Sequence, residues 1–242
     1  MKFFNKTRFE MVKGKRLYNY IIYAIGEIIL VVIGILIALW INNWSKENQI
    51  KKTNRNLQEK VLAQLDTDIA DLDDFRKDLD TLDNYYLRAL NRDYDAKKIV
   101  DQKLIPKILF EVIDLGLSEQ NMNSIENAVL DNSLASEELL YLSNRYKFHF
   151  KNIDDTEKII YQKTTTNIEA IEATQPWYTE LVTDFRCRED CYNYIFTDES
   201  NLARIASLRL LYKSNYAEIV KVFYSELQES RTELRTLYKA SE

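Results

Sequence analysis

A single long run of apolar residues stands out near the start of the chain, from Ile21 to Ile41. It contains 21 residues, and Glu27 is its only charged side chain. At a rise of ~1.5 Å per residue, a helix of this length spans ~31 Å, which matches the ~30 Å hydrocarbon core of a bilayer. The run is too long for the apolar region of a signal peptide, and residues 42–44 offer no small-residue cleavage site. The pattern predicts one uncleaved transmembrane helix over 21–41.

Beyond this run, the apolar positions recur at helical spacing rather than in the alternation of a strand. No glycine or proline interrupts residues 45–91, where Asp68 occupies one core position of a heptad pattern. The apolar members of that pattern are Val61, Leu65, Leu72, Phe75, Leu79, Leu82 and Tyr86. We expect a long helix over about 45–91, either as a separate element or as a continuation of the membrane helix.

Two more long helices are expected, over about 136–174 with Ser136 as the N-cap and over about 198–240. Short helices are expected before them, with Pro106 in a first turn and Gly116 at a helix end. The predicted fold class is all-α. One N-terminal transmembrane helix is followed by an elongated antiparallel helical bundle with coiled-coil-like packing.

The composition excludes several function classes. The chain of 242 residues has four glycines, two prolines and one histidine. Hairpin-rich β folds, dinucleotide-binding turns and phosphate-binding loops all need more or clustered glycines, and a two-histidine zinc site needs a second histidine. No pattern brings together a nucleophile, a base and oxyanion donors. We therefore expect no enzyme activity, no cofactor, no metal and no small-molecule ligand.

The charges divide the chain into three parts. Residues 1–20 carry a net charge of +5, the run 21–41 carries −1, and residues 42–242 carry −9. The basic residues nearest the run are Lys13, Lys15 and Arg16, which fit both a cytoplasmic location and contact with anionic lipid headgroups. Six Lys or Arg residues precede the run and five follow it by residue 60, so the bias is small. We expect a short cytoplasmic tail and a helical domain across the membrane, whose acidic charge argues against nucleic acid.

Two features of the run bear on its contacts in a bilayer. Aromatic residues stand at both ends, as expected for interfacial anchors: Tyr18, Tyr20, Trp40 and Trp44. One stripe at helical spacing is dominated by small residues and includes the acidic one: Ala24, Glu27, Val31, Gly34 and Ala38. Small residues let membrane helices approach closely, so we expect a helix–helix interface here, with a second copy of the chain as the simplest partner.

Glu27 lies on this stripe, ~9 Å inside the run at helical rise. An acidic side chain at that depth is costly and is a functional hypothesis by default. Three interpretations stay open. A protonated Glu27 hydrogen-bonds across a packed helix pair, or it lines a proton or ion pathway, or it contacts another membrane protein or a lipid headgroup.

The start of the chain also carries a resemblance. The opening MKFFNKTRFE and the segment YAIGEIILVVIGILIALWINNW at residues 23–44 resemble the bacterial family known as domain of unknown function 6090, found in Bacteroidota. The resemblance is strongest over residues 1–48. It implies a single-pass membrane protein with a short basic tail and a helical region after the membrane segment, and it supplies no activity and no functional residues. Together with the charge bias, this gives the expectation of a bacterial inner-membrane protein whose helical domain is periplasmic.

Three further groups are candidates for chemistry. Cys187 and Cys191, the only cysteines, form either a disulfide or two free thiols, and a bridge would need a turn between them. His149 stands among aromatic residues and is expected to serve packing or the surface. Eight aspartates crowd residues 66–83 and predict a solvated helix surface, with a weak cation or a basic partner as the alternative.

The expected function is that of a structural or interaction subunit, a scaffold or accessory protein that oligomerises through the membrane stripe. The first alternative is a subunit of a proton-driven or transport assembly that uses Glu27. The second is a ligand-sensing helical domain that works through a partner. Membrane lipid, a second copy and another membrane protein are the expected partners.

Overall fold

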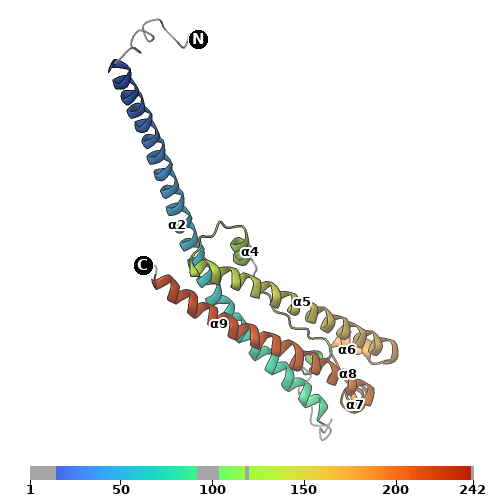
Figure 1. Ribbon diagram of the computed structural model, residues 1–242. Helices are drawn as coiled ribbons and strands as arrows, with labels where there is room; N and C mark the ends of the chain where they lie inside the picture. Colours follow the sequence, from blue (N-terminus) through green and yellow to red (C-terminus); the bar gives the residue numbers. More distant parts are fainter. Residues whose placement is uncertain (1–14, 92–103, 118–119, 241–242) are drawn as a thin grey trace, which may run out of the picture. The chain divides into compact units, whose positions relative to one another are not determined.

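The computed structural model describes residues 15–91, 104–117 and 120–240, and over these residues the chain is all-α without a strand (Figure 1). The chain divides into two compact units between Thr53 and Asn54, and each is described by itself. The helices are α2 (Lys15–Leu90), α3 (Leu104–Leu109), α4 (Gln120–Glu126), α5 (Leu134–Thr174), α6 (Tyr178–Asp184), α7 (Glu189–Thr197), α8 (Glu199–Leu210), the π-helix η2 (Leu211–Tyr216) and α9 (Ala217–Ala240).

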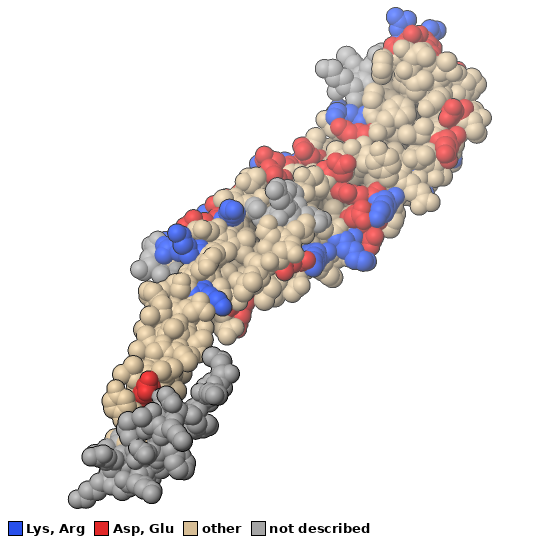
Figure 2. Space-filling view, turned by 90° about the horizontal axis from the view of Figure 1, so that it is seen from above, with Lys and Arg blue, Asp and Glu red and all other residues tan. Residues whose placement is uncertain are grey.

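Helix α2 contains both the apolar run and the expected first helix of the body. It has no break because residues 42–90 contain no glycine or proline, and a glycine inside a helix, such as Gly34, costs only ~1 kcal/mol. Within the run, an 18-residue window has a mean hydropathy of 2.8 and none of it is buried. Among the described residues, α2 is the one helix long and apolar enough to cross a membrane. Figure 2 shows the apolar run of α2 as a stretch almost free of charged side chains.

The N-cap of α5 lies three residues before the expected position. Ser133, not Ser136, is the N-cap: its backbone is extended and its Oγ accepts a hydrogen bond from the Ser136 backbone N–H at 3.2 Å. Asp131 selects this start, because it accepts hydrogen bonds from the hydroxyls of Ser133 (2.5 Å) and Ser136 (2.6 Å). Ser136 is therefore buried in the first turn of the helix instead of preceding it.

The C-terminal helical stretch begins at Glu199, one residue after the expected position, with Asp198 as its cap. The Asp198 carboxylate accepts a hydrogen bond from the Asn201 backbone N–H at 2.9 Å. Helical structure then continues to Ala240, but it passes through the π-helix η2 (Leu211–Tyr216). A π-helical turn shifts the direction of the side chains that follow it. The buried face therefore follows a different register in α9 than in α8.

Gly116 does not end a helix, contrary to the expectation. Helix α3 ends at Leu109, with Pro106 in its first turn as expected, and residues 111–117 form an extended segment without helix. The segment is held by contacts with distant helices, described below, which the local sequence does not reveal.

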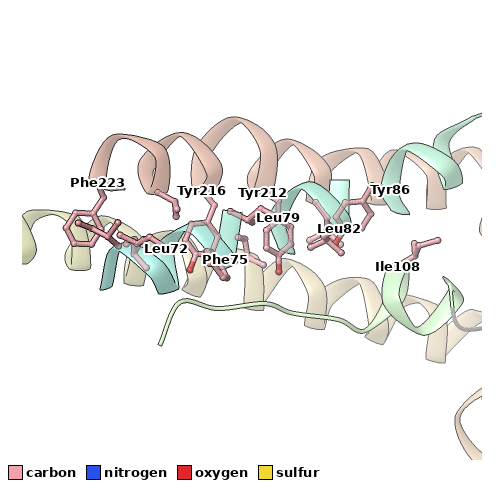
Figure 3. Close-up of a cluster of buried hydrophobic side chains, with 14 of the residues drawn as sticks. Leu72, Phe75, Leu79, Leu82, Tyr86, Ile108, Tyr212, Tyr216 and Phe223 are labelled. Carbon is pink, nitrogen blue, oxygen red and sulfur yellow. The ribbon is translucent and has the colours of Figure 1, made fainter. Parts of the chain in front are cut away.

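The core of the second unit lies among α2, α5 and the C-terminal helices. All the heptad positions named above are buried, and Figure 3 shows several of them against Tyr212, Tyr216 and Phe223. Ile108 brings α3 against one end of the same cluster. Each fully buried apolar side chain of this size contributes ~1.5–3 kcal/mol, so the shared core is the main force that holds these helices together.

Candidate functional site in the helical unit

The membrane stripe lies on the exposed surface of α2. Glu27, Val31, Gly34 and Ala38 are all exposed, and Ala24 is half-buried. A Cβ atom built on Gly34 meets nothing within 4 Å, so a second helix has room to approach. The aromatic anchors Tyr18 (69%), Tyr20 (44%), Trp40 (68%) and Trp44 (57%) are exposed as well. Of the basic residues, Lys13 lies outside the described residues, whereas Lys15 and Arg16 begin α2.

Cys187 and Cys191 are joined by a disulfide, with their Cα atoms 5.3 Å apart. Cys187 precedes α7 and Cys191 lies in its first turn, so the chain turns between them, as a bridge at this spacing needs. Just before the bridge, Phe185 ends α6 with a φ of 55° and a ψ of 34°, and its side chain is 71% exposed. A bulky residue is uncommon in this left-handed conformation.

The buried carboxyl group of Asp68 is the first unusual feature of the core. Asp68 is only 1% exposed and lies among apolar heptad positions on the buried face of α2. The Tyr146 hydroxyl of α5 donates to Oδ2 at 2.5 Å, and Gln64 Nε2 donates to Oδ1 at 2.5 Å. Burial raises the pKa of Asp68, and the two hydrogen bonds oppose that rise. Burial also raises the pKa of Tyr146, so its hydroxyl keeps its proton and donates.

A second polar group lies between α5 and α9. His149 is 3% exposed, and its Nε2 lies 2.7 Å from Oε2 of Glu226. The other oxygen of Glu226 binds the Arg145 guanidinium, which also stacks over the Tyr141 ring at 4.6 Å from its centroid. Burial lowers the pKa of His149 to about 4, and Arg145 acts in the same direction.

Phe223 joins these two polar groups into one layer across the unit. Its ring stacks on the His149 imidazole, with centroids 4.6 Å apart, and meets the Tyr146 ring edge-on at 5.1 Å. We call this set, Asp68, Tyr146, Phe223, His149 and Glu226, the polar layer. Burial shifts the pKa of two of its members, upward for Asp68 and downward for His149.

The extended segment 111–117 is held by a second polar cluster. The Ile113 backbone N–H donates to the Tyr212 hydroxyl at 3.3 Å, and the Leu115 backbone N–H donates to Glu157 Oε1 at 2.9 Å. The same carboxylate oxygen accepts from the Tyr216 hydroxyl. The π-helix places both tyrosines toward the core, where their rings stack with centroids 6.3 Å apart. This cluster fixes the segment to the core, and it leaves no unpaired group that points to a reaction.

The aspartate-rich segment of α2 is only partly a solvated surface, so that expectation was incomplete. Asp66 binds Arg231 and Arg235, and Asp83 binds Arg209 at 2.7 Å with 12% of its side chain exposed. Further pairs run from Asp80 and Asp83 to Lys213, and from Asp73 and Asp74 to Lys77 of the same helix. The basic partner is thus this chain's own C-terminal helical stretch, 126 to 169 residues away.

Within the described ranges, no three His, Cys, Asp or Glu side chains are grouped so as to hold a metal ion. The chemistry that the polar layer offers is gain and loss of protons inside a packed core. One signal for it was present in the sequence, namely an aspartate at a heptad core position. Nothing in the sequence assigned Tyr146, Phe223 or Glu226 to it, because those contacts depend on which helix faces which.

Comparison of the chain with family models, with curated proteins and with solved structures finds no match. The described residues define the class of protein: an all-α chain in which one described helix is long and apolar enough to span a membrane.

Proposed function

We propose that this chain is a single-pass inner-membrane protein whose residues 42–242 form an antiparallel helical bundle in the periplasm and act as a scaffold or accessory subunit. One observation carries the proposal, the fully exposed apolar window of α2 with a mean hydropathy of 2.8. Soluble monomers rarely expose an apolar surface of this extent, because it is stable only when covered by lipid or protein. The likeness of residues 1–48 to the domain of unknown function 6090 family supports the same topology.

The disulfide supports the periplasmic side. Bonds such as Cys187–Cys191 persist in oxidising compartments and are rare in the cytosol. The charge bias supports the same orientation, because the basic residues that precede the apolar run favour a cytoplasmic location for the N-terminal tail.

The stripe of Ala24, Glu27, Val31, Gly34 and Ala38 supports self-association as the way this protein assembles. All five residues lie at helical spacing on α2, and apart from the neighbouring residues and turns of the helix itself, nothing lies within 4 Å of a Cβ atom built on Gly34. Closely packed membrane helices gain dispersion energy and short interhelical hydrogen bonds at such faces. A protonated Glu27 is suited to one of those bonds.

The alternative is a subunit of a proton-driven or transport assembly. The observation that favours it is the same exposed Glu27, the only charged side chain of the run. In that case the carboxyl group exchanges protons in a complex with a second, multi-span protein.

Two measurements test the proposal. Topology is read from protease added to spheroplasts, which should degrade α9 while leaving a reporter on the N-terminal tail intact. Protection of α9 would overturn the periplasmic location. Oligomeric state is read from native mass spectrometry of the full-length protein released from its membrane in mild detergent.

Gly34→Ile should abolish the oligomer, because a branched side chain separates the helices. Gly26→Ile is the matched control: it is the other glycine of the run, it lies off the stripe, and it also has open space around it. Glu27→Gln keeps the hydrogen bond and removes ionisation, so an unchanged oligomer supports assembly. Loss of proton-linked function with an intact oligomer supports the alternative instead.

A further inference from the structure

His149 is buried with only one of its two ring nitrogens satisfied. Nε2 lies 2.7 Å from Glu226, whereas Nδ1 is buried without a hydrogen-bond partner among the described residues. We propose that His149 is a pH-sensitive latch between α5 and α9, closed while the imidazole is neutral and opened when it takes up a proton. The inference goes beyond the proposed scaffold function and concerns how the helical unit responds to its surroundings.

The contacts of Glu226 define the closed state. A carboxylate only accepts hydrogen bonds, and Glu226 is already bound through its other oxygen by Arg145. The neutral imidazole therefore carries its proton on Nε2 and donates it to Glu226. Nδ1 is then a lone-pair acceptor, and leaving one weak acceptor unpaired costs less than leaving a charged donor unpaired.

The open state follows from what surrounds the ring. Protonation puts a second N–H on Nδ1, which needs an acceptor, but one face of the ring stacks on Phe223 with centroids 4.6 Å apart, and the Phe148 ring lies edge-on with its centroid at 5.2 Å. A buried cation that keeps an unpaired N–H is strongly disfavoured. The protonated ring therefore has to leave the core to reach water, which separates it from Phe223 and Glu226 on α9.

The charged groups around the ring act on this balance in known directions. Glu226 of α9 favours the cation, and Arg145 of α5 disfavours it. Lys147 of α5 is neutralised by Glu126 of α4, and Asp68 of α2 lies behind Tyr146 rather than against the ring. Burial outweighs Glu226, since the pKa of His149 is lowered to about 4.

The expected size of the response follows from linkage. A histidine with a pKa of about 4 in the closed state and about 6.5 when exposed binds protons preferentially in the open state. Between pH 7 and pH 5, the ratio of open to closed molecules should rise about 20-fold, and it should change little above pH 7. Asp68 works in the opposite sense, because burial raises the pKa of its carboxyl and protonation favours the closed core.

The experiment uses the full-length protein in lipid nanodiscs. Hydrogen exchange of α9 is followed by mass spectrometry between pH 7 and pH 5, with the intrinsic exchange rates corrected for pH. The wild type should lose protection of α9 about 20-fold over this range. In His149→Gln the amide nitrogen can still donate to Glu226 but cannot titrate, so α9 should stay protected. An equal loss of protection in His149→Gln would overturn the latch.

A second measurement keeps the test decisive if His149→Gln does not fold. His149 is the only histidine of the chain, so isotope labelling of histidine gives a single imidazole signal by NMR. The latch requires a neutral ring protonated on Nε2 down to below pH 5. Titration near pH 6.5, or a ring protonated on Nδ1, would refute it. Neither readout depends on the orientation of the protein in the membrane, so failure of the latch and failure of the proposed function are distinguishable.

Discussion

Replacement of Asp68 by asparagine measures what a buried carboxyl group does in the core of the helical unit. Asparagine has nearly the same shape, its carbonyl oxygen can accept the hydrogen bond from Tyr146, and Gln64 can turn its amide to present an oxygen. The hydrogen bonds that join position 68 to Tyr146 and Gln64 can therefore be retained while the carboxylate is removed. We expect Asp68→Asn to fold with the same helical content and to be at least as stable as the wild type at pH 7.

A double-mutant cycle with Tyr146→Phe measures the coupling free energy between positions 68 and 146. In the wild type this change removes a hydrogen bond to a charged, 1% exposed residue that water cannot replace, which costs ~2 kcal/mol. In the Asp68→Asn background the same change removes a neutral hydrogen bond worth ~1 kcal/mol. The coupling free energy between the two positions should therefore be ~1 kcal/mol.

The pH dependence has a defined sign. Burial raises the pKa of Asp68 in the folded state above its ordinary value of 3.8, so the folded state holds this proton more tightly than the unfolded state does. The wild type should therefore lose free energy of unfolding relative to Asp68→Asn as the pH rises from below 4 toward neutrality. Urea unfolding in detergent micelles, followed by near-ultraviolet circular dichroism of the tyrosines, measures both quantities. Two results would refute the reasoning. One is an equal loss of stability on Tyr146→Phe in the wild type and in Asp68→Asn. The other is a wild type that gains stability relative to Asp68→Asn as the pH rises.

Three further changes have defined outcomes. Replacement of Cys187 and Cys191 together by serine should lower the free energy of unfolding by ~2 kcal/mol, as a short closed loop predicts, and reductant should lower the melting temperature of the wild type alone. Phe185→Gly should raise the free energy of unfolding, measured in urea, by ~0.5–1 kcal/mol, because glycine relieves the left-handed backbone and the exposed ring contributes little packing. A loss of stability would show that the ring is needed. Asp83→Asn should lower the free energy of unfolding in urea by ~1 kcal/mol and Asp66→Asn by less, since the Asp83 side chain is 12% exposed and that of Asp66 45%. Equal losses would contradict the role of burial.

The acidic residues of α2 show where reasoning from sequence reached its limit. Eight aspartates on a helix look like a solvated surface when only their own helix is considered. Asp66 and Asp83 instead bind arginines that are 126 to 169 residues away, and Asp68 meets a tyrosine 78 residues away. The pairing depends on the crossing of α2 with α5 and with the C-terminal stretch, and no local pattern carries that information.

The same limit explains the corrected details. Ser136 looked like a cap, but Asp131 engages both serines and moves the start of α5 to Leu134. Gly116 looked like a helix end, but Glu157 holds the backbone next to it in an extended form. In each case a side chain outside the local motif decided between two conformations of similar free energy.

The sequence alone determined the all-α class, the apolar run of membrane length and the approximate positions of the long helices. These properties depend on spacing and composition over one to several turns, where each residue interacts with neighbours three and four positions away. The tertiary structure alone decided the burial of His149, the partners of Asp68 and of the other aspartates, and the π-helix that turns Tyr212 and Tyr216 inward. Those features depend on contacts between helices far apart in the chain, whose geometry arises only when the apolar faces pack together and water is excluded from between them.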